Sequence, residues 1–178
     1  MATPPAPELQ AGEFTGRAEF QQALRFAIEQ ACAQGCTELG AFDPDFSVWP
    51  WSEAGLLDLL SDWVRAAPAS RHLHLLAPQF DGVRRAHPRF VAWRGRYGHA
   101  VHARALEPEA LSAVPPGGPA ALFWARSSTA QITLRLMSTR NWRGSLSFEA
   151  SEFVRWKDWF DAIAQHSYES FASTTLGL

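Results

Sequence analysis

The chain has 178 residues, of which 47% are hydrophobic and 19% are charged, with a formal net charge of −2. This balance is typical of a folded globular protein with one well-buried core, and it excludes a chain that is disordered throughout. No stretch approaches the roughly 18 consecutive apolar residues that a membrane-spanning helix needs. We therefore expect no membrane span and a cytoplasmic location.

The beginning of the chain differs in composition from the rest. Its first twelve residues have neither a basic end nor an apolar run, so they do not form a secretory signal. They contain three prolines, which stiffen an unfolded segment. We predict a disordered leader over residues 1–12 and a single α/β domain over residues 13–178.

Apolar spacing predicts alternating helices and strands through the first two thirds of the chain. A helix capped by Thr15 is predicted over residues 17–34, and a second helix begins at the N-cap Ser52. Pro88 interrupts the helical period of residues 80–97, so two short helices are predicted there, the second starting at Pro88. Predicted strands separate the helices, at residues 36–42, 71–77 and 99–106.

The last third of the chain begins with a predicted hairpin. Two β-type runs, residues 120–126 and 131–136, flank a polar turn, and a further strand is predicted near residues 145–148. A final amphipathic helix begins with Ser151 as its cap. Helical crossovers between strands imply parallel pairing, so the predicted fold is a mixed, mostly parallel sheet with helices on both faces.

This order of elements resembles one half of the phospholipase D-like fold over roughly residues 14–170. It is most similar to the small single-domain bacterial nucleases of that superfamily, and also to uncharacterised bacterial domains found alone or behind acetyltransferase domains. The nucleases use an H-x-K-x-x-x-x-D motif, in which a histidine attacks phosphorus and a lysine steadies the developing charge. The corresponding residues 114–124 contain neither histidine nor lysine, and the only lysine, Lys157, lies in the last helix.

The chain thus resembles a phospholipase D-like domain without its catalytic machinery, and no functional residue is carried over from the family. The resemblance implies a protein that is not an enzyme. The small nucleases are dimeric, which leaves a homodimer open for this chain.

Charge is distributed unevenly along the sequence. Up to Asp62, ten acidic side chains stand against two arginines, a net charge of −8, whereas residues 63–104 hold eight arginines against Asp81 alone, a net charge of +7. Clustered arginines suit phosphate groups or acidic surfaces, because the guanidinium fork matches their oxygen atoms. The predicted anion-binding residues, on the third helical segment and a later loop, are Arg84, Arg85, Arg89, Arg94, Arg96, His99, Arg140 and Arg143.

Several interpretations of this basic segment stay open. The arginines bind a phosphate-bearing ligand or a nucleic acid, or they contact the acidic third of a second copy or of another protein. A purely structural alternative is that they pair with acids of their own chain while the aromatic residues pack in the core. The enzymatic alternative is a phosphodiesterase-type hydrolase, with His87 or His99 acting beside Asp43 or Asp81.

Metal and cofactor sites have little support in the sequence. His72 and His74 project from one face of a predicted strand, and Asp43 or Asp45 would supply a third ligand. Nothing else stands at ligand spacing, so we expect no metal. Phosphate-binding glycine motifs and the G-x-S-x-G nucleophile motif are absent, and no cofactor is expected.

Overall fold

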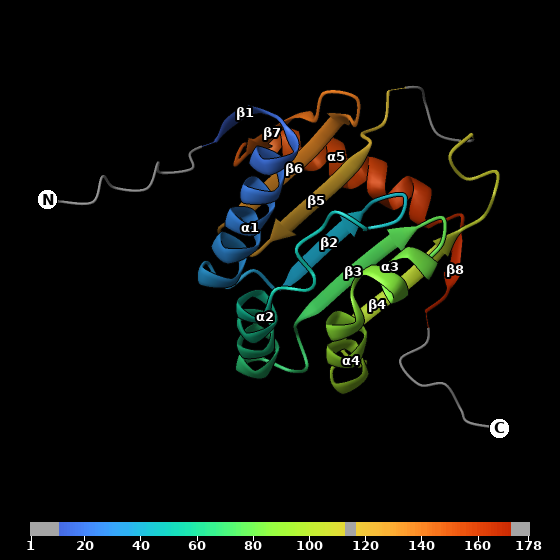
Figure 1. Cartoon of the computed structure of the whole chain (residues 1–178). Helices are drawn as coiled ribbons and strands as arrows, with labels where there is room; N and C mark the ends of the chain where they lie inside the picture. The colour runs from blue at the N-terminus through green and yellow to red at the C-terminus, as the bar shows by residue number, and fades with distance from the viewer. Residues whose placement is uncertain (1–10, 113–116, 172–178) are drawn as a thin grey trace, which may run out of the picture.

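One mixed sheet of eight strands organises the protein. The computed structural model describes residues 11–112 and 117–171, which form a single α/β domain. The strands lie in the order β1-β7-β6-β5-β2-β3-β4-β8 (Figure 1). Most of the predicted leader, residues 1–10, lies outside the described residues.

The elements follow the predicted alternation. The helices are α1 (Arg17–Ala33), α2 (Ala54–Ala66), α3 (Asp81–Ala86), α4 (Pro88–Arg96) and α5 (Ala150–Ala164). The strands are β1 (Gly12–Thr15), β2 (Glu38–Phe42), β3 (His72–Ala77), β4 (Val101–Leu106), β5 (Ala121–Arg126), β6 (Gln131–Ser138), β7 (Arg143–Ser147) and β8 (Ser167–Glu169). The predicted break at Pro88 is confirmed: proline occupies the first turn of α4, where its missing N–H removes no helical hydrogen bond.

The prediction of a mostly parallel sheet is wrong. Only β2–β3 and β3–β4 pair in parallel, and the other five neighbouring pairs are antiparallel. Between β4 and β5 the described chain has no helix, and β5 runs antiparallel along the free edge of β2. The hairpin-connected β6 and β7 then extend the sheet on that side.

The start of the domain also differs from the prediction. Gly12, assigned to the leader, begins β1, and Thr15 lies in that strand rather than capping α1, whose N-cap is Gly16. The cap predicted at Ser52 is likewise wrong, because Glu53 precedes α2 and Ser52 contacts the α3–α4 junction instead. The cap predicted at Ser151 is wrong as well, since Glu149 occupies the N-cap of α5.

Two apolar clusters lie against the sheet, because successive strand residues point to opposite faces. Leu39 and Leu73 belong to the larger cluster, which includes buried residues of α1, α2, α3 and α4. Phe42 and Trp124 belong to the smaller cluster, with the buried residues of α5. In Figure 1, α1–α4 lie in front of the sheet and α5 crosses behind it. None of the described helices is long and apolar enough to cross a membrane.

Candidate functional site

The arginine-rich segment forms α3, α4 and the turn before β4. Phe90 and Trp93 are buried and pack among the aromatic residues of the larger cluster, as their helical spacing predicts. The predicted basic residues that are exposed on this segment are Arg84, Arg85, Arg89, Arg96 and His99. Burial of the aromatic stripe therefore holds most of the cationic side chains at the surface.

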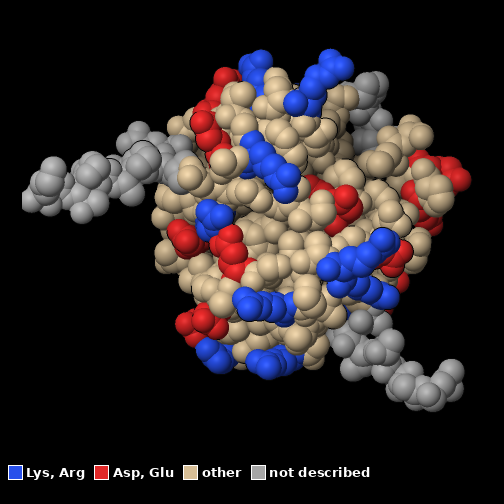
Figure 2. Space-filling view, viewed as in Figure 1, with Lys and Arg blue, Asp and Glu red and all other residues tan. Residues whose placement is uncertain are grey.

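The positive charge of this segment is not neutralised by ion pairs within the described chain. The ion pairs there involve Arg25, Arg65, Arg126, Arg135, Arg143 and Lys157, and none of the arginines between residues 83 and 104. Figure 2, viewed from the side of α1–α4, shows basic side chains over the α3–α4 region and others dispersed among acidic ones. The alternative of intramolecular pairing thus gains no support from described carboxylates.

Arg94 departs from the pattern of exposed arginines. It is four residues after Phe90, so it follows the buried stripe of α4, and the residue is only 6% exposed. Its guanidinium lies 4.8 Å from the ring centroid of Phe171, and that of Arg84 lies 5.3 Å from the same ring. Burial, and then the charge of Arg84, lower the pKa of Arg94. The Nε and Nη1 atoms of Arg94 have no hydrogen-bond partner among the described residues.

The predicted loop arginines lie elsewhere. Arg140 lies in the turn between β6 and β7, and Arg143 begins β7. In the strand order, β7 lies near one edge of the sheet, whereas β3 and β4 lie near the other edge. Arg143 approaches Glu13 of β1 at 3.8 Å, and the neighbouring Trp142 packs against Phe20 with ring centroids 5.6 Å apart. The structure therefore separates these two arginines from the α3–α4 surface.

Two of the four residues of the enzymatic alternative, His87 and Asp43, are engaged in structural contacts, whereas Asp81 and His99 are exposed. His87 is buried, with Nε2 2.8 Å from the carbonyl of Phe46 and Nδ1 2.7 Å from the hydroxyl of Ser52. Asp43 accepts bonds from the backbone N–H of Phe46 and the indole N–H of Trp49, at 2.8 and 2.9 Å. Burial raises the pKa of Asp43. These contacts fix the loop after β2 against α3 and α4.

A second group of polar residues lies on the face of the sheet that α5 covers. Cross-strand pairing places Trp124, Gly40, His74 and His102 in one row across β5, β2, β3 and β4. Trp124 lies over Gly40, where a Cβ atom would be only 2.0 Å from its ring. The ring of His74 is nearly parallel to those of Trp124 and His102, with centroids 6.2 and 5.2 Å away. The absence of a side chain at Gly40 therefore gives Trp124 its place beside His74.

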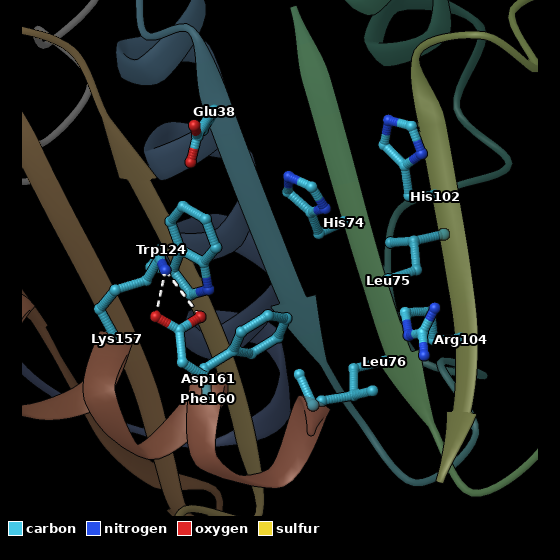
Figure 3. Close-up of a pocket in the computed structure, with 11 residues that line it drawn as sticks. Glu38, His74, Leu75, Leu76, His102, Arg104, Trp124, Lys157, Phe160 and Asp161 are labelled. Carbon is cyan, nitrogen blue, oxygen red and sulfur yellow. Dashed lines mark hydrogen bonds and ion pairs between the residues drawn. The ribbon is translucent and has the colours of Figure 1, made fainter. Parts of the chain in front are cut away.

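This row borders a cavity of about 290 Å³ under the C-terminal half of α5 (Figure 3). Leu76 and Phe160 form part of an apolar side, together with Ala164 near the end of α5. His102 and Arg104, from β4, line the opposite side. The cavity therefore has an apolar part and a part lined by hydrogen-bond donors.

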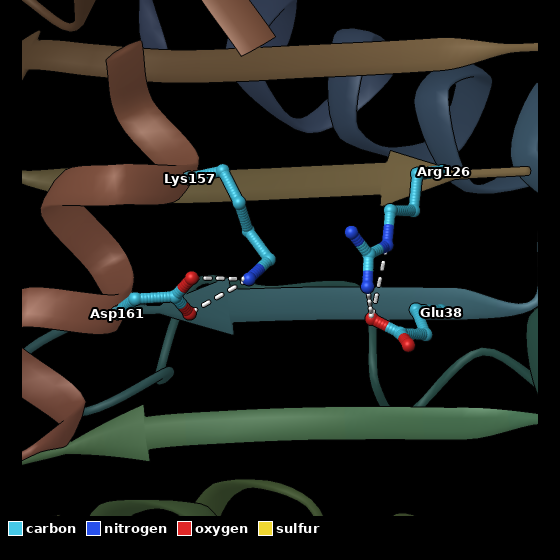
Figure 4. Close-up of polar contacts among 4 residues, drawn as sticks. All are labelled: Glu38, Arg126, Lys157 and Asp161. Atoms are coloured by element: carbon cyan, nitrogen blue, oxygen red, sulfur yellow. Dashed lines mark hydrogen bonds and ion pairs between the residues drawn. The ribbon is translucent and has the colours of Figure 1, made fainter. Parts of the chain in front are cut away.

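Ion pairs fix the charged groups at one side of the cavity (Figure 4). Lys157 Nζ lies 2.6 Å from the carboxylate of Asp161 and 4.7 Å from the ring centroid of Trp124. Arg126 Nη2 lies 2.9 Å from Glu38 Oε2. Burial alone would raise the pKa of Glu38, but the hydrogen bond and charge of Arg126 outweigh it and the pKa is lowered. Both carboxylates are thus already balanced by a cation.

Two of the three histidines on this face, His72 and His102, contact each other through ring nitrogens. His72 Nδ1 lies 3.0 Å from His102 Nε2 across β3 and β4. No group of three or more potential ligand residues in the described part of the chain is arranged to hold a metal ion. Burial and then His72 lower the pKa of His102, the charge of Glu169 opposes them, and the charge of Arg94, from a helix packed on the other face, adds a smaller lowering effect.

We expect His74 to make stability depend on pH. Burial, followed by the charge of His102, lowers its pKa from 6.5 to about 4, with Glu38, His72 and Lys157 as further charged neighbours. An unfolded chain therefore takes up the proton first, so the stabilising contribution is complete above pH 6.5 and is lost as the pH falls towards 4. The free energy of unfolding should decrease by about 2 kcal/mol over this range.

Denaturant unfolding of the protein and of a His74→Gln variant between pH 7 and pH 4.5 measures this contribution. The variant should lose less stability than the parent as the pH falls. Parallel curves for the two proteins would show that His74 does not titrate as its burial requires.

Sequence reasoning did not identify the cavity residues His102, Arg104, Trp124 and Lys157 as a group. Gly40 lies inside an otherwise apolar strand, and a glycine in that position often indicates that another group approaches the backbone closely. No family model matches the chain, and no curated protein matches its sequence. A function therefore has to be inferred from the chemistry of the α3–α4 surface and of the cavity beneath α5.

Proposed function

We propose that this protein is a binding module for a phosphate-bearing partner, a nucleotide or a nucleic-acid strand, and that α3 and α4 form the binding surface. The observation that carries the proposal is the environment of the Arg94 side chain. Its guanidinium is buried beside a second guanidinium, Arg84, with unpaired N–H groups and no ion pair to a described carboxylate. Two cations against one phenyl ring repel each other, and an anion between them offsets that repulsion.

The chemistry of the surface favours phosphate as the anion. Guanidinium groups bind phosphate oxygen atoms through paired, charge-assisted hydrogen bonds, and a phosphate bridges two of them. Four further basic residues, Arg85, Arg89, Arg96 and His99, are exposed on the same segment. They extend the positive field around the Arg84–Arg94 pair and attract a polyanion.

We also propose that the chain has a phospholipase D-like fold, with helices on both faces of the sheet, and that it has lost the catalytic motif of that family. The order α1-β2-α2-β3-α3-α4-β4 and the late hairpin before α5 support it. The structural engagement of His87 and Asp43 supports a function without catalysis.

Fluorescence anisotropy with a labelled single-stranded oligonucleotide of about ten nucleotides tests the proposal. Affinity should fall steeply between 50 and 200 mM salt, because each neutralised phosphate releases a counterion. An Arg84→Gln variant should bind at least about fivefold more weakly, since one charge-assisted contact contributes about 1 kcal/mol or more. Arg140→Gln is the matched control. It removes the same charge from the turn between β6 and β7, near the other edge of the sheet, and should bind like the parent.

Affinity that is flat across this salt range would exclude a phosphate partner. Equal losses in the Arg84 and Arg140 variants would show that the chain attracts polyanions only through its overall charge. A change of oligomeric mass in the Arg84 variant, with oligonucleotide affinity unchanged, would instead identify the basic surface as a contact between copies of this chain.

A further inference from the structure

The cavity beneath α5 lies on the other face of the sheet from the arginine surface. Its volume of about 290 Å³ is at the lower end of the range for small-molecule sites, so its occupant has about one ring. The apolar part, with Leu76, Phe160 and Ala164, fits the body of such a molecule. The polar groups around it determine what the remainder of the molecule must be.

Those polar groups divide into engaged and available ones. Lys157 and Glu38 are engaged in ion pairs with Asp161 and Arg126. The available groups are donors. The indole N–H of Trp124 is buried without an acceptor among the described residues, and the tryptophan itself is only 1% exposed.

His74 and Arg104 complete the set of available donors. Neither ring nitrogen of His74 has a hydrogen-bond partner in the described chain, and a neutral imidazole always carries one N–H. Arg104 bonds Ser167 through Nε at 2.8 Å and through Nη2, but it forms no ion pair with a described carboxylate. Glu169 is the cross-strand neighbour of Arg104 on β8, but the two side chains do not form an ion pair. One cation without an ion pair to a described carboxylate, beside neutral donors, matches a ligand with a single negative charge.

We propose that this cavity binds a small organic monocarboxylate with a ring-sized apolar body. The carboxylate of the ligand lies beside Arg104 and His74, at the side of the cavity that β4 lines. Its ring packs against Leu76 and Phe160. A phosphate dianion fits less well, because much of the lining is apolar and Arg104 is the lone cation without an ion pair among the described lining residues.

Benzoate is the probe, with two matched compounds. We expect isothermal titration calorimetry to give a dissociation constant on the order of 1 mM for benzoate. Benzamide keeps the ring and lacks the charge, and acetate keeps the charge and lacks the ring. Each should bind at least about tenfold more weakly than benzoate, and inorganic phosphate should not displace benzoate.

Two substitutions in α5 give a matched pair of variants. Ala164→Phe places a ring in the cavity and should abolish benzoate binding. Ala162→Phe adds the same ring to the exposed side of the same helix and should leave binding unchanged. Arg104→Met should weaken benzoate at least about tenfold, whereas Arg84→Gln, on the other face, should have no effect.

Chemical shifts of ¹³C-labelled histidine side chains give a second measurement that does not depend on the variants. Benzoate should shift the resonances of His74 and His102 and leave that of the buried His87 unchanged. Equal binding by the Ala164 and Ala162 variants, or benzoate binding with no shift at His74, would overturn the proposal. Because oligonucleotide binding involves the opposite face, its presence or absence in the same samples separates this proposal from the function proposed above.

Discussion

Replacing Gly40 with alanine should destabilise the protein by about 3 kcal/mol, since overpacking a rigid core site costs about 1–3 kcal/mol and sometimes more. The new Cβ atom would lie 2.0 to 2.3 Å from three ring atoms of Trp124. The indole cannot move aside easily, because Phe153 and Phe160 of α5 contact it edge-on with ring centroids 6.1 and 5.4 Å away. The strain therefore has to be relieved by displacing α5 or by bending β2.

Gly55→Ala is the matched control for this substitution. Gly55 lies in α2, and a methyl group added there would have no neighbouring atom within 4 Å, so alanine should be neutral or stabilising by up to about 1 kcal/mol. Guanidinium unfolding of both variants measures the difference. A Gly40→Ala/Trp124→Leu double variant should recover part of the loss, because the smaller side chain removes the clash. Similar stabilities for Gly40→Ala and Gly55→Ala would contradict the packing described for Trp124.

Replacing Arg94 with methionine should stabilise the protein in phosphate-free buffer by about 1–3 kcal/mol. The substitution keeps an unbranched side chain against Phe171 and removes a buried cation whose Nε and Nη1 atoms lack partners among the described residues. Such unsatisfied donors cost about that amount, and replacing buried charge with an apolar side chain is often stabilising. The same variant should lose the increase in melting temperature that inorganic phosphate gives the parent protein, because that increase depends on binding to the folded state.

Arg96→Met is the control, since Arg96 is exposed two residues further along the same segment. It should change the free energy of unfolding by less than about 0.5 kcal/mol and keep most of the response to phosphate. A loss of stability in Arg94→Met would mean that this charge already has a partner within the chain. The proposal that an external anion binds there would then be wrong.

The local structure of the arginine-rich segment was predictable, because it depends on residues close in sequence. Pro88 forces the break between α3 and α4, and the spacing of Phe90 and Trp93 identifies the buried stripe. The position of Arg94 on that stripe follows from the same period, four residues after Phe90. The sequence pattern grouped it with the exposed arginines because clustering of charge says nothing about helical phase.

Elements and contacts that depend on distant residues were not predictable in this way. β1 and β8 are only four and three residues long, too short for an alternating pattern to be recognised, and they exist because β7 and β4 offer them an edge. The position of β5 next to β2 decides both the antiparallel character of the sheet and the contact of Trp124 with Gly40. His74 and His102 meet only through the register of β3 and β4.

The charge of Arg94 is the smallest of the influences on the pKa of His102, after burial, His72 and Glu169, and it links the two faces of the sheet electrostatically. An anion that neutralises Arg94 removes one source of repulsion from His102, so this imidazole takes up a proton more readily. A carboxylate beside His102 then gains a positively charged neighbour and binds more tightly. Thermodynamic reciprocity requires the converse, that a carboxylate in the cavity strengthens anion binding at Arg94. Cooperativity of this kind needs no movement of the backbone.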